Sequence, residues 1–385
     1  MTEFSLKDRY ILASQYFLYF GVMGAFLPYF NLYCYKLGFT GFQIGALSAS
    51  RSVIMIISPL LMGALADRFQ TRKKIYLLCH FTSAAIWCFY FLTSSFWAML
   101  IITVCYTAFY APIISFLEAF TIDILGKRRK KYGSIRVWGT IAFIVTVFIL
   151  GKVLDIYPIR IILLFIFAGS AIQAAFAIKI PEVKPLNKKP FYHEAITLLR
   201  KQEVIIFLAS AFLMLVSHGM YYGFFSIHLE NLGYDPTFIG IAWGLASTAE
   251  ILVMINSNRI FKKFSINTVI IFAFAVAVLR WLTLSLAVSP VIILLSQTMH
   301  AFSYAAFHIS SLLYIDSMTS NATKTLGQAL NNAVTYGLGL MVGFFLSGWL
   351  YEKAGSYALF GLSSLIALTG GIIFVLYRIF GTKSR

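Results

Sequence analysis

The chain has 385 residues, of which 60% are hydrophobic and only 12% are charged, about half the charged fraction of an average soluble protein. Too little charge remains to solvate the surface of a soluble fold, so lipid must surround most of the molecule. The net charge of +17 comes from short basic clusters between apolar blocks. A nucleic-acid-binding protein gathers such residues on one solvated face, so we expect no nucleic-acid partner.

Long apolar blocks, separated by charged and turn residues, follow one another along the chain. The first block follows Lys7 and Arg9 as in a signal peptide, but it is longer and lacks a small-residue cleavage site, so we expect a retained helix. Each block can cross a hydrocarbon core of about 30 Å. We predict an all-α membrane protein with twelve transmembrane helices, at residues 10–36, 41–66, 75–93, 96–124, 133–155, 159–180, 203–230, 236–262, 266–287, 290–318, 326–353 and 356–380.

Positive charge alternates with the predicted helices. The segments that would share one side of the membrane with the N-terminus contain 25 of the 31 lysines and arginines. The opposite loops contain only Lys36, Lys152, Arg160 and Lys353. By the positive-inside rule we expect both termini and the central segment in the cytoplasm, and the chain in the plasma membrane, a bacterial inner membrane.

One polar, proline-rich segment, Pro181 to Pro190, interrupts the apolar pattern. We therefore predict an N-terminal six-helix bundle at 1–180, a cytoplasmic linker at 181–202 and a C-terminal six-helix bundle at 203–385. The halves look related, because Ile122-Asp123 matches Ile315-Asp316 and Gly133 matches Gly327 at nearly the same offset. Repeated bundles with a solute site between them are a transporter architecture.

The predicted loop after residue 66 contains a recognisable motif, Gly63-Ala-Leu-Ala-Asp67-Arg68-Phe-Gln-Thr-Arg72-Lys-Lys. This motif resembles the G-x-L-a-D-r-x-g-x-R signature of the major facilitator superfamily, with Gln70 where the family has glycine. The resemblance implies the twelve-helix fold of that superfamily and a gating role for Gly63, Asp67, Arg68 and Arg72. Gly63 would let helices pack closely, and Asp67 could pair with Arg72.

Further matches are distributed over nearly the whole chain: Gly24 to Phe30, Tyr132 to Gly139, Arg280-Trp281 and Gln297 to Ala301. Together they resemble the phenylpropionate-permease group, which is related to the lactose permease and to nucleoside–proton symporters. The resemblance implies proton-driven uptake of a small organic solute by alternating access.

Burying an ionisable side chain in an apolar helix costs free energy, so such residues are candidates for function. In the first half, Glu118 and Asp123 lie near the cytoplasmic end of one helix, and Arg136 lies at matching depth on the next. Either carboxylate could pair with Arg136, as a solute site, a proton site or a structural ion pair. Glu118 and Arg136 also match the sugar-binding pattern of the lactose permease.

Arg51 lies in the outer half of its predicted helix, without an acidic residue at an obvious depth. It could attract an anionic solute or extend to the outer headgroups. Trp138 and Tyr19 are further candidates for lining a solute site.

In the second half, Glu250 and Arg280 lie at depths that long side chains can bridge. We expect a charge-relay pair, with a static buried ion pair as the alternative. A low-dielectric cavity disfavours the charged form of a carboxylate and so raises its pKa toward neutrality. Proton coupling requires a pKa in that range. His300 and His308 recur on one face and can also carry protons. The lactose permease has a glutamate one turn after its histidine, whereas Ser303 and Ser311 stand here, which favours Glu250.

These residues suit more than one solute. Arg51, Arg136 and Arg280 suit an aromatic or other carboxylate, which we favour. Glu118 and Glu250, with tryptophans nearby, suit a sugar or nucleoside. A proton-antiport efflux pump is the alternative within transport, but the helix at 133–155 lacks the Gly-Pro end typical of such pumps.

An intramembrane enzyme is the alternative from another class, and no nucleophile–base or metal-ligand motif supports it. We therefore expect no catalytic residue, no metal and no cofactor. The expected partners are a small solute, protons and membrane lipids, and we expect a monomer.

Overall fold

The computed structural model describes residues 5–182, 201–319 and 323–381. Within these ranges the backbone is helical almost throughout and forms no β-strand. Nine helical runs of the described chain are long and apolar enough to cross a membrane, and a further apolar helix is shorter. The all-α membrane architecture predicted from the sequence is therefore confirmed.

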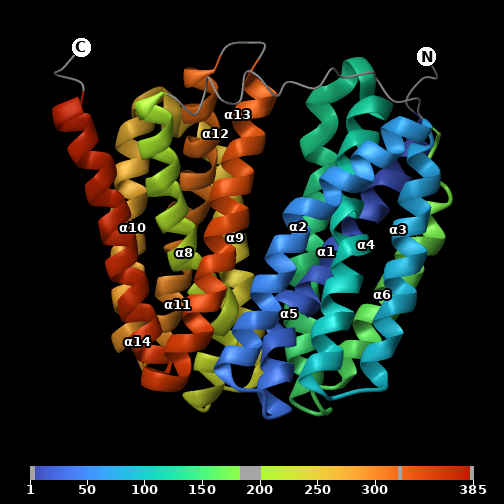
Figure 1. The fold of residues 1–385 in the computed structure, drawn as a ribbon, viewed down its shortest axis with the longest axis horizontal. Helices are drawn as coiled ribbons and strands as arrows, with labels where there is room; N and C mark the ends of the chain where they lie inside the picture. Colours follow the sequence, from blue (N-terminus) through green and yellow to red (C-terminus); the bar gives the residue numbers. More distant parts are fainter. Residues whose placement is uncertain (1–4, 183–200, 320–322, 382–385) are drawn as a thin grey trace. The chain divides into compact units, whose positions relative to one another are not determined.

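Figure 1 shows the helices of both halves of the chain. The first half contains α1 (Leu6–Lys36), α2 (Gly41–Phe69), α3 (Arg72–Trp87), a 3₁₀ turn (Cys88–Phe91), α4 (Phe96–Leu125), a 3₁₀ segment (Gly126–Lys131), α5 (Tyr132–Leu154) and α6 (Ile161–Ala177). The second half contains α8 (Gln202–Asn231), α9 (Pro236–Lys263), α10 (Ile266–Leu286), α11 (Pro290–Thr298), a π-helix (Ala301–Ala306), α12 (Phe307–Met318), α13 (Lys324–Asn331), a π-helix (Asn332–Gly339), α14 (Leu340–Leu376) and a last π-helix (Tyr377–Gly381).

Each of the twelve predicted segments corresponds to a helix or to a run of helices. The segment at 290–318 is α11, a π-helix and α12. The segments at 326–353 and 356–380 lie in one assigned run, Leu326–Phe380. Within this run α14 reverses its direction (Figure 1), and the non-helical residue there is Gly355, with φ +72°. Only glycine adopts this angle without strain, so Gly355 forms the turn between the two predicted spans.

Contacts along the chain group it into two units. The first unit consists of Met1–Phe39, Ser50–Lys188 and Asp235–Gly244, and the second consists of Thr40–Ala49, Lys189–Tyr234 and Leu245–Arg385. Most of α1 to α6 thus belongs to the first unit, and most of α8 to α14 to the second. The predicted boundaries at 180 and 203 stay a prediction, and residues 183–200 of the predicted linker lie outside the described residues.

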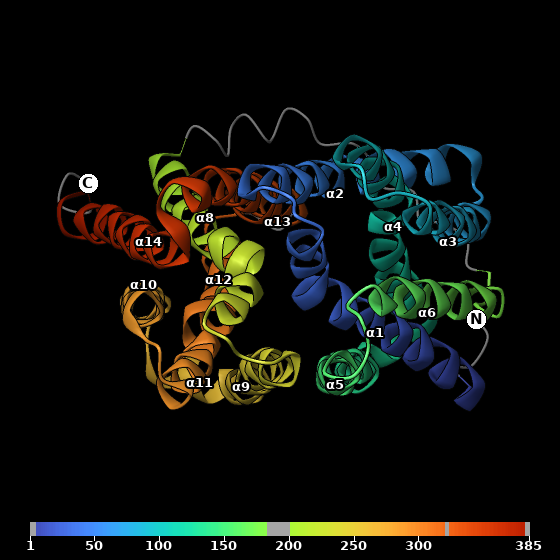
Figure 2. The ribbon, with the colours of Figure 1, turned by 90° about the horizontal axis from the view of Figure 1, so that it is seen from below.

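In the first unit, α1 packs along α5 and α6 (Figure 2). The approach is close at Gly24, where an added Cβ would lie 3.0 Å from the backbone oxygen of Phe143. Buried polar side chains in this unit are paired, because Gln15 Nε2 donates to the carbonyl of Gln173 (3.1 Å) and Gln15 Oε1 accepts from Tyr76 (3.0 Å). Lipid cannot satisfy a polar group, so such bonds keep these side chains inside the bundle.

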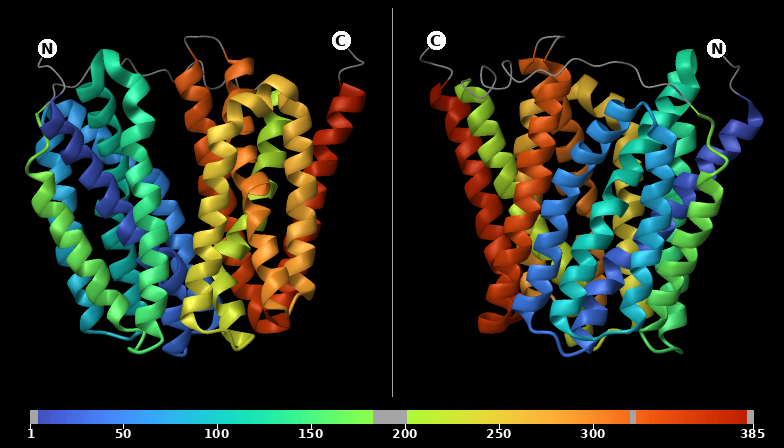
Figure 3. Two further views of the ribbon diagram at one scale, coloured as in Figure 1. Left: turned by 180° about the vertical axis from the view of Figure 1, so that it is seen from behind. Right: turned by 45° about the vertical axis from the view of Figure 1, so that its right-hand side comes forward.

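In the second unit, α14 packs against both α8 and α10 (Figure 3). The helices α8 and α14 meet at two glycines, Gly219 and Gly343. A Cβ on Gly343 would lie 2.4 Å from the backbone oxygen of Val216 and 2.9 Å from the Cα of Gly219. Small residues at such crossings let helix backbones approach, which is a common device of membrane helices.

We predict that Gly343→Ala lowers the apparent melting temperature of the detergent-solubilised protein. The added methyl group forces two backbones apart, at a cost of about 1–3 kcal/mol. Gly361→Ala is the control in the second span of α14, beyond the turn at Gly355, since no heavy atom lies within 4 Å of its Cβ position. Thermal unfolding followed by circular dichroism measures both, and equal melting curves for the two variants would contradict the packing described here.

Candidate functional site

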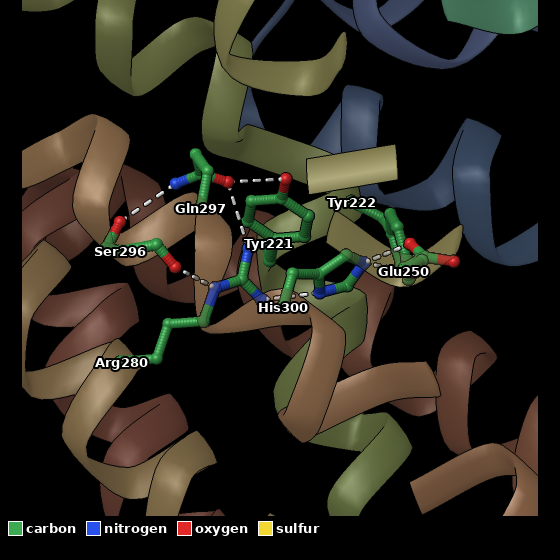
Figure 4. A network of polar contacts seen from close by, with 7 residues as sticks. All are labelled: Tyr221, Tyr222, Glu250, Arg280, Ser296, Gln297 and His300. Carbon is green, nitrogen blue, oxygen red and sulfur yellow. Dashed lines mark hydrogen bonds and ion pairs between the residues drawn. The ribbon is translucent and has the colours of Figure 1, made fainter. Parts of the chain in front are cut away.

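The most buried charged group in the second unit is the guanidinium of Arg280 on α10, which is 0% exposed. Its Nη1 atom bonds to His300 Nδ1 (2.8 Å), its Nη2 donates to Gln297 Oε1 (3.0 Å), and its Nε donates to the carbonyl of Ser296 (3.1 Å). The guanidinium carbon also lies close to two aromatic rings, 4.3 Å from the centre of the Tyr221 ring and 4.4 Å from that of Trp281. Arg280 is therefore held by several partners at once (Figure 4).

His300 joins Arg280 to a carboxylate on another helix. Its Nε2 atom lies 3.0 Å from Oε1 of Glu250 on α9, so the three side chains form a continuous row (Figure 4). Glu250 and Arg280 were expected to pair directly, and the structure places His300 between them. The side chain of Glu250 is 21% exposed while that of His300 is 3% exposed, so Glu250 is the accessible end of the row. We call Glu250, His300 and Arg280 the relay.

Arg280 decides which nitrogen of His300 carries the proton. A guanidinium has only N–H donors and stays charged, so Nδ1 must accept the bond. The ring proton then lies on Nε2 and points at Glu250 Oε1. His300 is therefore neutral, and its hydrogen bond to Oε1 persists whether or not the other carboxyl oxygen carries a proton. The relay can exchange a proton at Glu250 without rearranging His300.

Local backbone structure sets the position of His300. The α-helix ends at Thr298, and a π-helix follows at Ala301–Ala306. A π-turn contains an additional residue per turn and is frequent at functional sites. Gln297 and His300 both reach Arg280 from this junction. Gln297 also accepts from Tyr221 of α8 (2.9 Å), so α8, α10 and α11 are connected through one amide.

The other predicted histidine, His308, lies in the same row of side chains. The ring of Tyr304 stacks on His300 (centroids 5.0 Å apart) and on His308 (6.3 Å). His308 Nδ1 bonds to the hydroxyl of Tyr336 at 2.5 Å. Tyr336 belongs to the second π-helix, Asn332–Gly339. Aromatic and imidazole rings thus continue from the relay to a second irregular helix.

In the first unit, Glu118 on α4 lies within electrostatic reach of Arg136 and of the Tyr132 hydroxyl. The guanidinium of Arg136 stacks on Phe20 of α1, 3.8 Å from the ring centroid. The structure therefore brings Glu118 and Arg136 together, as predicted from their depth. Trp138, a predicted solute contact, is 44% exposed and lies on another face of α5.

Arg51 on α2 lies beside a group of buried tyrosines that includes Tyr19. Its guanidinium is 4.5 Å from the centre of the Phe26 ring, and Tyr19 is one of the tyrosines within electrostatic reach. The two residues, predicted separately as solute contacts, are neighbours in the first unit.

The predicted gate residues are arranged differently from the expectation. Arg72 Nη1 donates to Asp123 of α4 at 2.6 Å, with both side chains largely buried, instead of pairing with Asp67. Asp123, predicted near Arg136 or as a proton site, therefore forms an ion pair with α3. Arg68 stacks weakly on its neighbour Phe69, with 5.8 Å between guanidinium and ring centre.

Two further residues of the same motif, Gly63 and Gln70, concern the backbone. The close packing expected at Gly63 is absent from the described structure, where no heavy atom lies within 4 Å of its Cβ position. Gln70, which stands at the glycine position of the family motif, has φ +51°. This left-handed conformation suits glycine, so the motif's glycine preference has a local backbone cause. Gln70 Nε2 donates to the carbonyl of Asp67 (2.6 Å).

Sequence reasoning missed several members of the site. Gln297 was noticed only as part of a motif, and Tyr221 and Tyr336 were not singled out. Tyrosine is abundant here, with 22 residues, so the sequence gives little reason to prefer Tyr221 or Tyr336 over the others. The available signal was the Gln297–His300 spacing, which places both side chains near one face of a helix.

Comparisons with known proteins agree with this architecture. The sequence pattern of the MFS_1 like family matches residues 10–362. A protein named probable 3-phenylpropionic acid transporter, from Escherichia coli (strain K12), is 24% identical over 94% of this chain and 96% of its own. Nucleoside permease NupG of the same organism is 22% identical over 87% and 86%. The crystal structure of nucleoside transporter NupG superposes with a TM-score of 0.86 at 20% identity, covering 96% of this chain and 98% of that chain.

We predict strong energetic coupling between Arg280 and Glu250. Arg280→Gln leaves the Glu250 charge without its partner, and Glu250→Gln leaves Arg280 likewise, at about 3–5 kcal/mol each. The double variant removes both charges, so it should lose much less stability than the sum of the losses in the two single variants. The exposed pair Asp316–Lys324 (2.9 Å) is the control, with expected coupling of about 0–1 kcal/mol. Equal coupling in the two cycles, measured by thermal unfolding, would show that the relay is not a charge-compensated unit.

Proposed function

The chain belongs to the MFS_1 like family of major facilitator proteins, and on this premise we propose that it is a proton-coupled symporter importing a small organic solute. It is a membrane transporter and not an enzyme. The observation that carries the proton coupling is the relay, in which a partly accessible carboxylate is connected through a neutral histidine to a buried guanidinium.

The relay supports symport through its charge. With Glu250 ionised, it contains one negative and one positive charge and is neutral overall. A proton on Glu250 leaves the charge of Arg280 uncompensated, because His300 stays neutral. That excess positive charge attracts an anionic solute, so proton and anion favour each other's binding. Reciprocal coupling of this kind is what a symporter needs.

The proposed solute is an aromatic or other carboxylate, with a sugar or nucleoside next. Arginines at Arg51, Arg136 and Arg280 support the first choice, as does the name of the phenylpropionic acid relative. Glu118, close to Arg136 and Tyr132, supports the second, because paired polar groups can hold hydroxyls. The nucleoside permease among the relatives agrees with that choice.

Transport would proceed by alternating access, with a gate on the basic side of the membrane. We assign this gate to the Arg72–Asp123 ion pair with Asp67 and Arg68 beside it. His308 and Asp123 are second candidates for proton coupling. The excess of basic residues supports cytoplasmic termini in a bacterial inner membrane, and we propose a monomer.

The decisive experiment is uptake into proteoliposomes with and without an inward proton gradient. Labelled aromatic carboxylates, a nucleoside and a disaccharide form the panel. The wild type should accumulate one of them against its gradient. Glu250→Gln should abolish accumulation while solute exchange across the vesicle persists, because the variant mimics the permanently protonated relay. Glu182→Gln, at an exposed position, should behave as wild type.

Other outcomes separate the alternatives. Uptake that ignores the proton gradient would reject symport and leave a facilitator. Solute leaving the vesicle interior in exchange for protons would identify an efflux antiporter instead.

A further inference from the structure

Arg51 is a second charged side chain within a membrane-spanning helix, and it forms no ion pair with any residue that the structure describes. Arg51 lies within α2 and is partly exposed. Among the described residues, its guanidinium makes no ion pair and no hydrogen bond. It contacts the Phe26 ring, and several tyrosines lie near enough to interact with its charge. Arg280, in contrast, has three hydrogen-bond partners.

An unpaired guanidinium at this position is energetically unfavourable. Charges in helix centres pair with one another or line a polar cavity, and a charge in a low-dielectric interior is destabilising without a partner. A ring face such as that of Phe26 compensates only a small part of this cost. The five N–H donors of Arg51 therefore favour an anion with acceptors in one plane.

The surroundings of Arg51 are aromatic. The rings of Tyr19 and Tyr110 stack with centroids 5.1 Å apart and planes 8° apart, and Tyr110 stacks on Tyr106 at 5.0 Å and 18°. Trp87 follows at 4.8 Å from Tyr106. These four side chains are all less than 8% exposed. We call Tyr19, Tyr110, Tyr106 and Trp87 the aromatic stack.

The aromatic stack also contains an unused polar atom. The Tyr106 hydroxyl is buried and makes no hydrogen bond of ordinary geometry among the described residues, although the Ser170 side chain lies within its reach. It can donate to the same anion that Arg51 attracts, since the Tyr106 hydroxyl also lies within electrostatic reach of Arg51. A buried, unsatisfied hydroxyl beside an unpaired guanidinium points to a missing acceptor.

From this arrangement we propose that Arg51 and the aromatic stack form a recognition site for an aromatic monocarboxylate. The carboxylate receives the guanidinium fork and the Tyr106 hydroxyl, and the flat ring of the solute contacts the aromatic side chains. A planar carboxylate matches the fork in a bidentate way, and aromatic rings favour stacked or edge-to-face partners. This inference rests on the proposed transport of an aromatic carboxylate and adds the site that recognises it.

The same features disfavour the other solutes. A neutral sugar or nucleoside offers no charge to compensate Arg51. A phosphate dianion needs more donors than one guanidinium and one hydroxyl provide. The carboxylate is the anion whose charge and geometry fit a single guanidinium.

Binding of matched acids and amides to the purified full-length protein tests the proposal. The probes are benzoate, phenylacetate, 3-phenylpropionate and their primary amides, measured by equilibrium dialysis in detergent. Wild type should bind at least one acid with an affinity at least about 30-fold above that of its amide. Arg51→Gln should lose that preference while still binding the amide, and Arg51→Lys should retain part of it. Tyr106→Phe should weaken the acid selectively.

Arg160→Gln is the matched control, since Arg160 is exposed and donates to the backbone oxygen of Phe91 (2.7 Å). It should bind the acids as wild type does. Arg51→Gln removes an uncompensated charge, so its melting temperature without solute should equal or exceed that of wild type. This readout shows that lost binding is not lost folding.

The outcomes separate this inference from the proposed function. Acids and amides bound equally by wild type, no acid bound at all, or acid binding unchanged in Arg51→Gln, would each overturn the recognition site. Acid binding that depends on Arg51, combined with uptake that ignores the proton gradient, would support the site and reject proton symport. Gradient-driven acid uptake that is unchanged in Arg51→Gln would support proton symport and reject the recognition site.

Discussion

The cost of placing charge in a lipid-surrounded bundle governs the arrangement of this protein. A guanidinium cannot lose its proton, so Arg280 must be compensated wherever it is buried. The chain meets this demand with an amide and a backbone carbonyl from α11, with the imidazole of His300 just before the π-helix, and with two aromatic rings. His300 in turn contacts Glu250 on α9, which supplies the negative charge. One buried charge thereby determines the side chains on four helices of the second unit. Arg51 differs from Arg280 in this respect, because its one close contact in the described residues is the Phe26 ring.

Much of the fold was predictable because lipid imposes a simple rule on sequence. A span needs about twenty apolar residues, and this threshold located all twelve segments. The turn at Gly355 was predicted as a loop even though the helix assignment continues through it. The π-helices were not predicted, since a single inserted residue leaves no mark in a pattern of apolar residues that already covers every face. The close packing of Gly219 with Gly343 was equally invisible, because glycine is common throughout the chain.

The sequence predicted most residues of the candidate site but not which of them contact each other. Depth along a helix follows from residue count, so Glu250 and Arg280 were placed at comparable levels, and Glu118 was placed near Arg136. The direction in which a side chain points around the helix axis does not follow from depth. For this reason His300 between Glu250 and Arg280 and the pairing of Arg72 with Asp123 instead of Asp67 came only from the structure. Gln70 is the opposite case, since its left-handed backbone gives a physical cause for a glycine preference that the sequence presented only as a departure.

The burial of Arg280 has a consequence for how the protein responds to ionic strength. Dissolved ions weaken interactions between solvated charges over a screening length of about 8 Å under physiological conditions. They cannot enter the space between Arg280 and His300, where both side chains are almost completely buried. The half-exposed pair of Asp316 and Lys324, in contrast, lies within reach of counterions. We therefore expect salt to weaken the Asp316–Lys324 ion pair and to leave the contact between Arg280 and His300 unchanged.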